Sequence, residues 1–258
     1  MHFIIMKKLI HSLAIFCPLA LILLTEAIFS YPASIYWLSP LLLALVAAAV
    51  WFLVGRKIKN KILTFYLPPI FLVSSTLLYT IFLQGQTLRR LIVILGGIVL
   101  AVFFENIYTY HFSQEKYQRY SLSNFSSYFN LIVIFLLNAS LFSLIIFLQF
   151  PLWGAILINV IVTLLLTYQN LTVSRIEFIR SWPYILTISV ISVEIFWAAS
   201  FLPLSVYNQA LILTIAHYLT AGISRNRLLG IFDRKIIIRY AVICLFCLLA
   251  ILITAKYK

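Results

Sequence analysis

The sequence predicts an all-α integral membrane protein, a polytopic bundle of about nine transmembrane helices. Of its 258 residues, 64% are hydrophobic and only 10% are charged, whereas an ordinary soluble domain has about 45–50% apolar and about 25% charged residues. The apolar residues form long continuous runs, and the basic residues lie between these runs. No soluble domain of this size can bury so much apolar surface, and a disordered chain requires low hydrophobicity. Both classes are therefore excluded.

The apolar runs have the length that a membrane crossing requires. A bilayer core about 30 Å thick needs about 20 apolar residues per helix, because unpaired backbone groups cannot face lipid. Since such runs extend along the whole chain, residues 1–258 are expected to form a single transmembrane domain. The expected spans are 9–29, 35–54, 62–83, 88–108, 128–149, 152–170, 182–202, 205–222 and 236–255. Strands of a membrane barrel would instead alternate in hydropathy over about 10 residues.

The first span resembles a signal peptide in one respect, and the eighth span contains polar residues. The first follows Lys7 and Lys8, as a signal peptide would, but its apolar run exceeds the roughly 7–15 residues of a signal core and no small-residue cleavage site follows. We therefore expect a retained first helix. The eighth span contains Asn208, Gln209 and His217, so a bundle of eight spans is the alternative.

Short connections predict how neighbouring spans are arranged. They lie at 31–34, 84–87, 150–151 and 203–204, and a short connection forces two helices to pack antiparallel. The chain therefore predicts four hairpins followed by a final helix. The tetrapeptide at 81–84 recurs at 146–149, which fits either an internal duplication or chance in so apolar a chain.

The basic residues predict the orientation of the chain. With the N-terminus in the cytoplasm, most of the 19 basic residues fall on the cytoplasmic side, as the positive-inside rule requires. Nine crossings then place the C-terminus on the opposite side of the membrane. The cytoplasmic set is Lys7, Lys8, Arg56, Lys57, Lys59, Lys61, Lys116, Arg119, Arg175, Arg180, Arg225, Arg227, Arg234, Lys235 and Arg239, and the opposite set is Arg89, Arg90, Lys256 and Lys258.

Motifs for catalysis or metal binding are mostly absent from the sequence. Asp233 is the only aspartate, so aspartate-rich metal sites are excluded, and neither His-Glu-x-x-His nor Gly-x-Ser-x-Gly occurs. Cys244 and Cys247 have the spacing of a redox or zinc pair, but their span contains no histidine, and zinc needs about four ligands. We interpret them as buried small hydrophobic residues. We expect no metal and no cofactor, and the balance favours a protein that is not an enzyme.

Polar residues at membrane depth form the predicted substrate-binding or ion-binding site. Glu194 is the only acid near the middle of a span, where an ionised side chain costs about 2.5–3.5 kcal/mol and usually marks function or a buried pair. Asn138, Asn159 and His217 lie in neighbouring spans, and Trp197 shares the helix face of Glu194. We expect Glu194 to lie within hydrogen-bonding reach, directly or through one water, of a polar side chain on a neighbouring helix, with Asn138 and His217 as the favoured partners.

Charged residues at the ends of spans predict two further contacts. Glu26 ends the first span, while Arg89 and Arg90 open the fourth, so an ion pair between them is expected. The last cytoplasmic loop interleaves apolar residues with an interfacial basic cluster, which is expected to attract anionic lipid headgroups. That cluster comprises Arg225, Arg227, Arg234 and Lys235. Nucleic acid is not an expected partner, because the positive charge is scattered between apolar runs.

Three functions fit this pattern. A small permease or ion-coupled carrier would use the central polar site around Glu194. A non-catalytic scaffold or subunit of a membrane protein complex would need only packing surfaces, basic loops and a few buried polar pairs. An intramembrane enzyme acting on a lipid-linked substrate, with Glu194 or His217 as a base, is the third. The surroundings of Glu194, either a wet cavity or a dry helix contact, discriminate between the first two.

Overall fold

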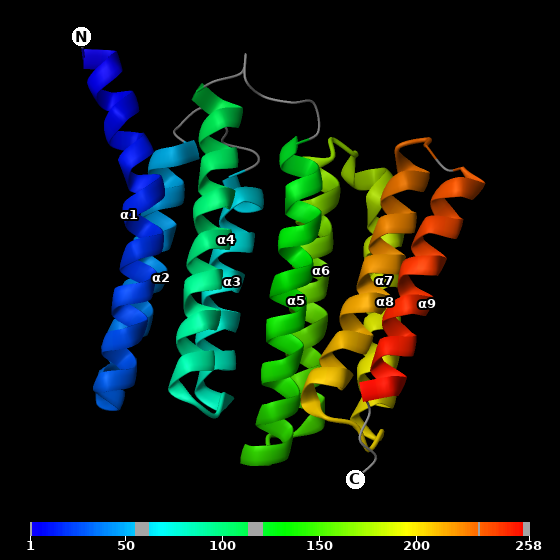
Figure 1. Ribbon diagram of the computed structural model, residues 1–258. Coiled ribbons are helices and arrows are strands. Elements are labelled where there is room, and N and C mark those ends of the chain that lie inside the picture. Colours follow the sequence, from blue (N-terminus) through cyan, green and yellow to red (C-terminus); the bar gives the residue numbers. More distant parts are fainter. Residues whose placement is uncertain (1, 55–61, 113–120, 232, 255–258) are drawn as a thin grey trace. The chain divides into compact units, whose positions relative to one another are not determined.

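The chain is all-helical wherever its structure is described. The computed structural model describes residues 2–54, 62–112, 121–231 and 233–254, which contain nine α-helices and one short 3-10 helix (Figure 1). The helices are α1 (His2–Ser30), α2 (Ile35–Val54), α3 (Ile62–Phe82), α4 (Gln86–Phe112), α5 (Ser121–Leu148), α6 (Leu152–Val173), α7 (Phe178–Ser200), α8 (Val206–Leu228) and α9 (Arg234–Thr254), with η1 (Pro32–Ser34) after α1. Each expected span coincides with one of these helices, so the all-α prediction is confirmed.

Prolines inside the helices do not break them. Pro18 lies within α1, Pro40 within α2, Pro68 and Pro69 within α3, and Pro183 within α7. Neighbouring polar side chains can satisfy the backbone groups that a proline frees. Thr187 Oγ1 also donates to the carbonyl of Pro183 itself at 2.8 Å, which adds a hydrogen bond in the turn after this proline.

Six helices are long and apolar enough to cross a membrane by length and composition. They are α2, α3, α4, α5, α6 and α7, with segments from Pro32–Val54 to Phe178–Ser200. In α1 the described apolar part, Ile15–Ser30, is shorter. The chain is thus a membrane-embedded helical protein. Crossings by α1, α8 and α9 remain predictions.

Exposed apolar side chains suit the lipid-facing surface of such a protein. Tyr36 and Trp37 begin α2 and Trp153 begins α6, and all three are among the most exposed large side chains. Aromatic rings prefer the boundary between lipid and water. These helix ends therefore mark where the membrane interface would lie.

The helices group into two compact units, Met1–Phe129 and Asn130–Lys258, with the division inside α5. In the first unit, α1 packs against α2 and α4, and α3 packs against the same two helices. Two adjacent glycines of α4 permit these close contacts. A Cβ atom at Gly96 would lie 3.3 Å from Thr76 Oγ1 of α3, and one at Gly97 would lie 3.0 Å from Ile22 Cδ1 of α1.

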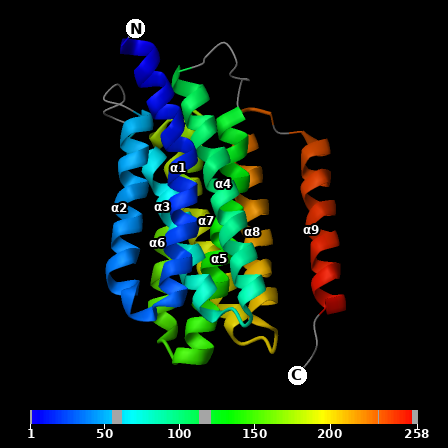
Figure 2. The same ribbon diagram turned by 60° about the vertical axis from the view of Figure 1, so that its left-hand side comes forward.

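In the second unit, α6, α7, α8 and α9 contact one another in chain order as antiparallel neighbours (Figures 1 and 2). Tight turns join them. The turn after α6 has Arg175 at φ 62°, and the turn after α8 has Gly230 at φ 72°. Gln209, which makes the eighth span polar, is buried and bridges the α7–α8 turn. Its Nε2 donates to the carbonyls of Ala199 and Leu202 at 3.0 and 3.1 Å.

One end of the second unit carries its described basic residues. They lie at the α6–α7 and α8–α9 turns or on the adjoining helix ends: Arg175, Arg180, Arg225, Arg227, Arg234, Lys235 and Arg239. The turns at the opposite end, 149–151 and 201–205, contain no charged residue. The predicted basic loops at 56–61 and 116–119, and Lys256 and Lys258, lie outside the described residues.

Candidate functional site

The two predicted asparagines meet in the interior of the second unit. Asn138 of α5 and Asn159 of α6 are both 0% exposed. Asn159 Nδ2 donates to Asn138 Oδ1 at 2.7 Å, and Asn138 Nδ2 donates to the carbonyl of Ile134 at 2.8 Å. Polar groups in a lipid-surrounded bundle favour such interhelical hydrogen bonds. This pair therefore joins α5 to α6.

Ser192 of α7 extends the pair to a third helix. Its Oγ donates to Asn159 Oδ1 at 2.8 Å and lies 3.4 Å from Thr163 Oγ1 of α6. Asn159 is thus the hub, since its amide donates to α5 and accepts from α7. The sequence analysis did not single out Ser192. Its position in the Glu194 span was the available signal, but serine is common in such spans and carries no charge.

A second buried pair lies one layer nearer the basic end of the unit. Asn130 Nδ2 of α5 lies 2.9 Å from Gln169 Oε1 and 3.1 Å from the carbonyl of Leu166, both on α6. Asn130 and Gln169 are buried. Together with Asn138 and Asn159 they make the α5–α6 contact polar in two layers. The sequence did not predict the contact between Asn130 and Gln169.

His217 of α8 is buried beside the network but not bonded to it. Its side chain is 6% exposed, and Nδ1 has no hydrogen-bond partner among the described residues. A small cavity of about 10 Å³ between α7 and α8 is lined by both His217 and Ser192. No hydrogen bond joins the histidine to the serine in the described structure.

Glu194 does not join the cluster, and it forms no direct hydrogen bond with Asn138 or His217 in the described structure. Its side chain is exposed, and it forms no hydrogen bond or ion pair with the described residues. Helix geometry gives the reason. Successive residues turn by about 100°, so Glu194 projects nearly opposite to Ser192, which faces the interior.

Trp197 shares the outward face of Glu194, as the spacing predicts. It is exposed, and its ring contacts Phe201 edge-on at 5.4 Å between centroids. The exposed large apolar residues of this face recur every four or seven positions along α7: Trp182, Leu186, Val190, Trp197 and, just past the helix end, Phe201. We call these five residues the α7 stripe. Glu194 lies within it.

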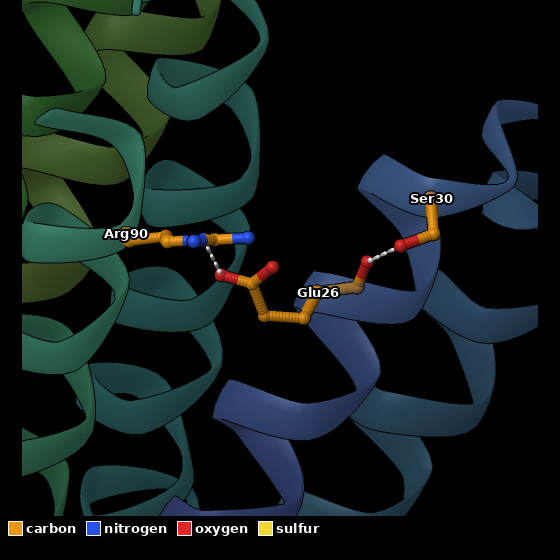
Figure 3. A network of polar contacts seen from close by, with 3 residues as sticks. All are labelled: Glu26, Ser30 and Arg90. Atoms are coloured by element: carbon orange, nitrogen blue, oxygen red, sulfur yellow. Dashed lines mark hydrogen bonds and ion pairs between the residues drawn. The ribbon is translucent and has the colours of Figure 1, made fainter. Parts of the chain in front are cut away.

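The first unit carries the predicted ion pair (Figure 3). Arg90 Nε donates to Glu26 Oε1 at 3.1 Å, with the two side chains 61% and 34% exposed respectively. Arg89 instead donates to the carbonyl of Leu83 at 3.1 Å, and its guanidinium lies 4.5 Å from the ring centroid of Phe29. The prediction is confirmed for Arg90, and the contact ties the end of α1 to the start of α4.

The interfacial basic cluster lies around the α8–α9 turn. Arg225 and Arg227 occupy the last turn of α8, where positive charge favourably meets the helix dipole. Arg234 and Lys235 open α9 and are exposed.

The cysteine pair packs between α8 and α9. Cys244 is buried with Ile215 and Ile251, and Cys247 lies against the same cluster. This is the packing environment expected of small hydrophobic side chains. Within the described ranges, no group of three or more His, Cys, Asp or Glu side chains could hold a metal ion.

A comparison with protein families gives one match. The family model described as "Protein of unknown function (DUF5656)" matches residues 18–254. This match covers every helix from the second half of α1 to the end of α9. No curated protein and no solved structure is significantly similar to the chain.

Proposed function

We propose that the chain, which belongs to the DUF5656 family, is a non-catalytic subunit of a membrane protein complex and binds its partner through the α7 stripe. One observation carries the proposal. Glu194 lies on an exposed face that is mostly apolar, in a helix with the length and composition of a membrane span, and it has no polar partner among the described residues.

Glu194 lies well inside α7. It lies six residues before the last residue of α7, Ser200, which is about 9 Å along the helix axis. A charge at the centre of a span costs about 2.5–3.5 kcal/mol. Side chains also tilt toward the helix N-terminus, so the carboxylate of Glu194 is directed away from the nearer end of α7. This direction makes it harder for the carboxylate to reach the membrane interface.

A basic residue on a partner helix would complement the charge of Glu194. A partner helix that offers Lys or Arg at the depth of Glu194 would neutralise the carboxylate and would pack its apolar residues on the α7 stripe. Ionisable groups inside membranes usually pair in this way. The chain's own described basic residues lie near helix ends, so a partner protein is the proposed source of the cation.

The buried network supports a structural role more than a transport site. Its amides and hydroxyls bond mainly to one another. The cavity beside Ser192 and His217 measures about 10 Å³, whereas small-molecule sites measure about 300–1,000 Å³. Among the described residues, the carrier and enzyme hypotheses have no comparable observation in their favour.

The proposal includes an orientation. We place the basic end of the second unit in the cytoplasm, because positive charge accumulates there in membrane proteins, where it would also meet anionic lipid headgroups. The N-terminus would then be cytoplasmic and the C-terminus on the other side. Reporter fusions after residues 60, 85, 118, 150, 176, 204 and 230 should alternate from inside to outside, and two successive fusions on one side would contradict this orientation.

Site-specific photo-cross-linking in native membranes tests the partner. A photo-reactive residue at Val190 should yield a cross-linked product. The same residue at Leu157, on the outer face of α6, is the control, because the two positions are equally exposed at 55% and 56%. The captured protein must carry a transmembrane Lys or Arg, and Glu194→Leu must abolish the product.

A charge exchange completes the test. Glu194→Lys should prevent cross-linking at Val190, and changing the partner's basic residue to Glu should restore it. Cross-linking to lipid alone, a product of twice the chain's mass, or full cross-linking with Glu194→Leu would each contradict the proposal.

A further inference from the structure

We propose that the cavity between α7 and α8 is a binding site for one water molecule that joins Ser192 to His217. The water would extend the hydrogen-bonded chain from Asn138 through Asn159 and Ser192 to a fourth helix. The proposal is independent of the partner assigned to the α7 stripe, because Ser192 and Glu194 occupy opposite faces of α7.

The size of the cavity fits a single water molecule. It measures about 10 Å³, and a cavity needs at least about 10–15 Å³ of this kind of space to hold one water. Its lining is mostly aliphatic, but three polar side chains contribute to it: Ser192, His217 and Thr220. Dry cavities are apolar, whereas a water needs two to four polar partners.

The polar side chains that line the cavity can still form hydrogen bonds with that water. Ser192 gives its only hydroxyl proton to Asn159 Oδ1, and Thr220 gives its proton to the carbonyl of Ala216 at 2.8 Å. Each hydroxyl oxygen can still accept a hydrogen bond. The two hydrogens of a water can therefore be directed to the oxygens of Ser192 and Thr220, or one of them to His217.

The imidazole of His217 has a buried nitrogen that needs a hydrogen-bond partner. Its Nδ1 is buried and has no hydrogen-bond partner among the described residues, while the side chain as a whole is 6% exposed. A buried polar atom without a partner is costly, and buried waters typically satisfy such atoms. A water in this cavity would serve Nδ1 as a donor or as an acceptor, according to the tautomer of the ring.

The consequence is a polar connection across four consecutive helices. Direct hydrogen bonds join α5 to α6 and α6 to α7, and the water would join α7 to α8. Without it, the described side chains at this depth make no polar contact between α7 and α8 through His217. The water would therefore fix the rotation of α8 relative to α7 at the depth of the asparagine pair.

Water-edited solid-state NMR on the full chain in lipid bilayers tests this site. With ¹⁵N-labelled histidine, the ring nitrogens of His217 should receive magnetisation from water despite their burial. The chain has four histidines, and loss of the signal in His217→Gln assigns it. Absence of transfer from water to the His217 ring in the unmodified chain would overturn the proposal.

Cavity-filling variants sharpen the test. Ala216 lines the cavity, so Ala216→Val should displace the water and abolish the transfer. Ala198→Val is the matched control, because Ala198 lies on the exposed side of α7 and does not line the cavity. If Ala216→Val does not fold, Thr220→Val, which keeps the shape but removes one acceptor, should reduce the transfer at least twofold. Unchanged transfer in a folded Ala216→Val or Thr220→Val variant would also overturn the site.

Discussion

Two interhelical polar contacts, one in each unit, lie at different positions along their helices. In the first unit, Arg90 and Glu26 pair at the ends of α4 and α1, with both side chains partly exposed. In the second unit, Asn138 and Asn159 pair in the interior of α5 and α6 and are completely buried. Charges are expensive inside a membrane and cheap at its surface, whereas neutral amides can be paired at any depth. The chemistry of each contact therefore matches its depth.

Glu194 departs from this rule, and the departure is informative. It is a charged residue well inside α7 with no polar contact in the described structure. A charged side chain is expected at a helix end, as with Glu26, unless a group outside the chain compensates its charge. The comparison of the two contacts thus supports the proposed partner at the α7 stripe.

The largest expected effect is the loss of the hub of the buried network. Asn159→Leu removes the donor to Asn138 and the acceptor for Ser192 and leaves both without their hydrogen bond. We expect a loss of about 1–3 kcal/mol in the free energy of unfolding, measured by denaturant titration in detergent micelles. Asn208→Leu, at the start of α8, is the control and should change stability by less than about 0.5 kcal/mol. Equal effects of the two changes would contradict the hub assignment.

Close packing should also differ between the units. A Cβ at Gly222 of α8 would lie 2.5–2.6 Å from ring atoms of Tyr240 of α9, closer than the 3.0 Å between Gly97 and Ile22 in the first unit. Tyr240 is further held by Asn226 Nδ2, 3.3 Å from its hydroxyl. Overpacking costs about 1–3 kcal/mol.

We therefore expect Gly222→Ala to destabilise the chain by about 1–2 kcal/mol and Gly97→Ala to destabilise it less, as measured by the same titration. The Tyr240→Leu background supplies the control, because it removes the ring that Gly222→Ala would meet. A cost of Gly222→Ala that persists with Tyr240→Leu would show that the ring is not its cause.

The ion pair of the first unit should contribute little. Glu26→Gln removes one charge from a pair whose side chains are both partly exposed, and surface ion pairs contribute about 0–1 kcal/mol. The effect should shrink further as salt is raised, because ions screen exposed charges. Unfolding measured at low and high ionic strength checks this. A salt-independent cost above about 2 kcal/mol would place the pair among buried interactions.

The smallest expected effect on the isolated chain comes from Glu194. Because its side chain has no partner among the described residues, Glu194→Gln should leave the stability of the purified chain within about 0.5 kcal/mol, while it weakens cross-linking at Val190 in native membranes. Thermal unfolding of the purified chain measures the first quantity. A large destabilisation of the purified chain would mean that Glu194 acts within the fold and not toward a partner.

The sequence by itself determined the helices and the depth of their polar residues. Long apolar runs predicted all nine helices, and the positions of Glu26 and Arg90 at the ends of two such runs predicted their ion pair. Both inferences depend only on position along the chain, because hydropathy reports how deep a residue lies in a membrane.

The tertiary structure alone decided which way each helix faces. In a soluble protein the apolar side of a helix points inward, but lipid is as apolar as the protein interior, so hydropathy does not fix the rotation of a membrane helix about its axis. The inward position of Ser192, the outward position of Glu194 and the contact of Gly222 with Tyr240 all depend on that rotation. Rotation is set by the packing of small and large side chains between neighbouring helices, which no single span contains.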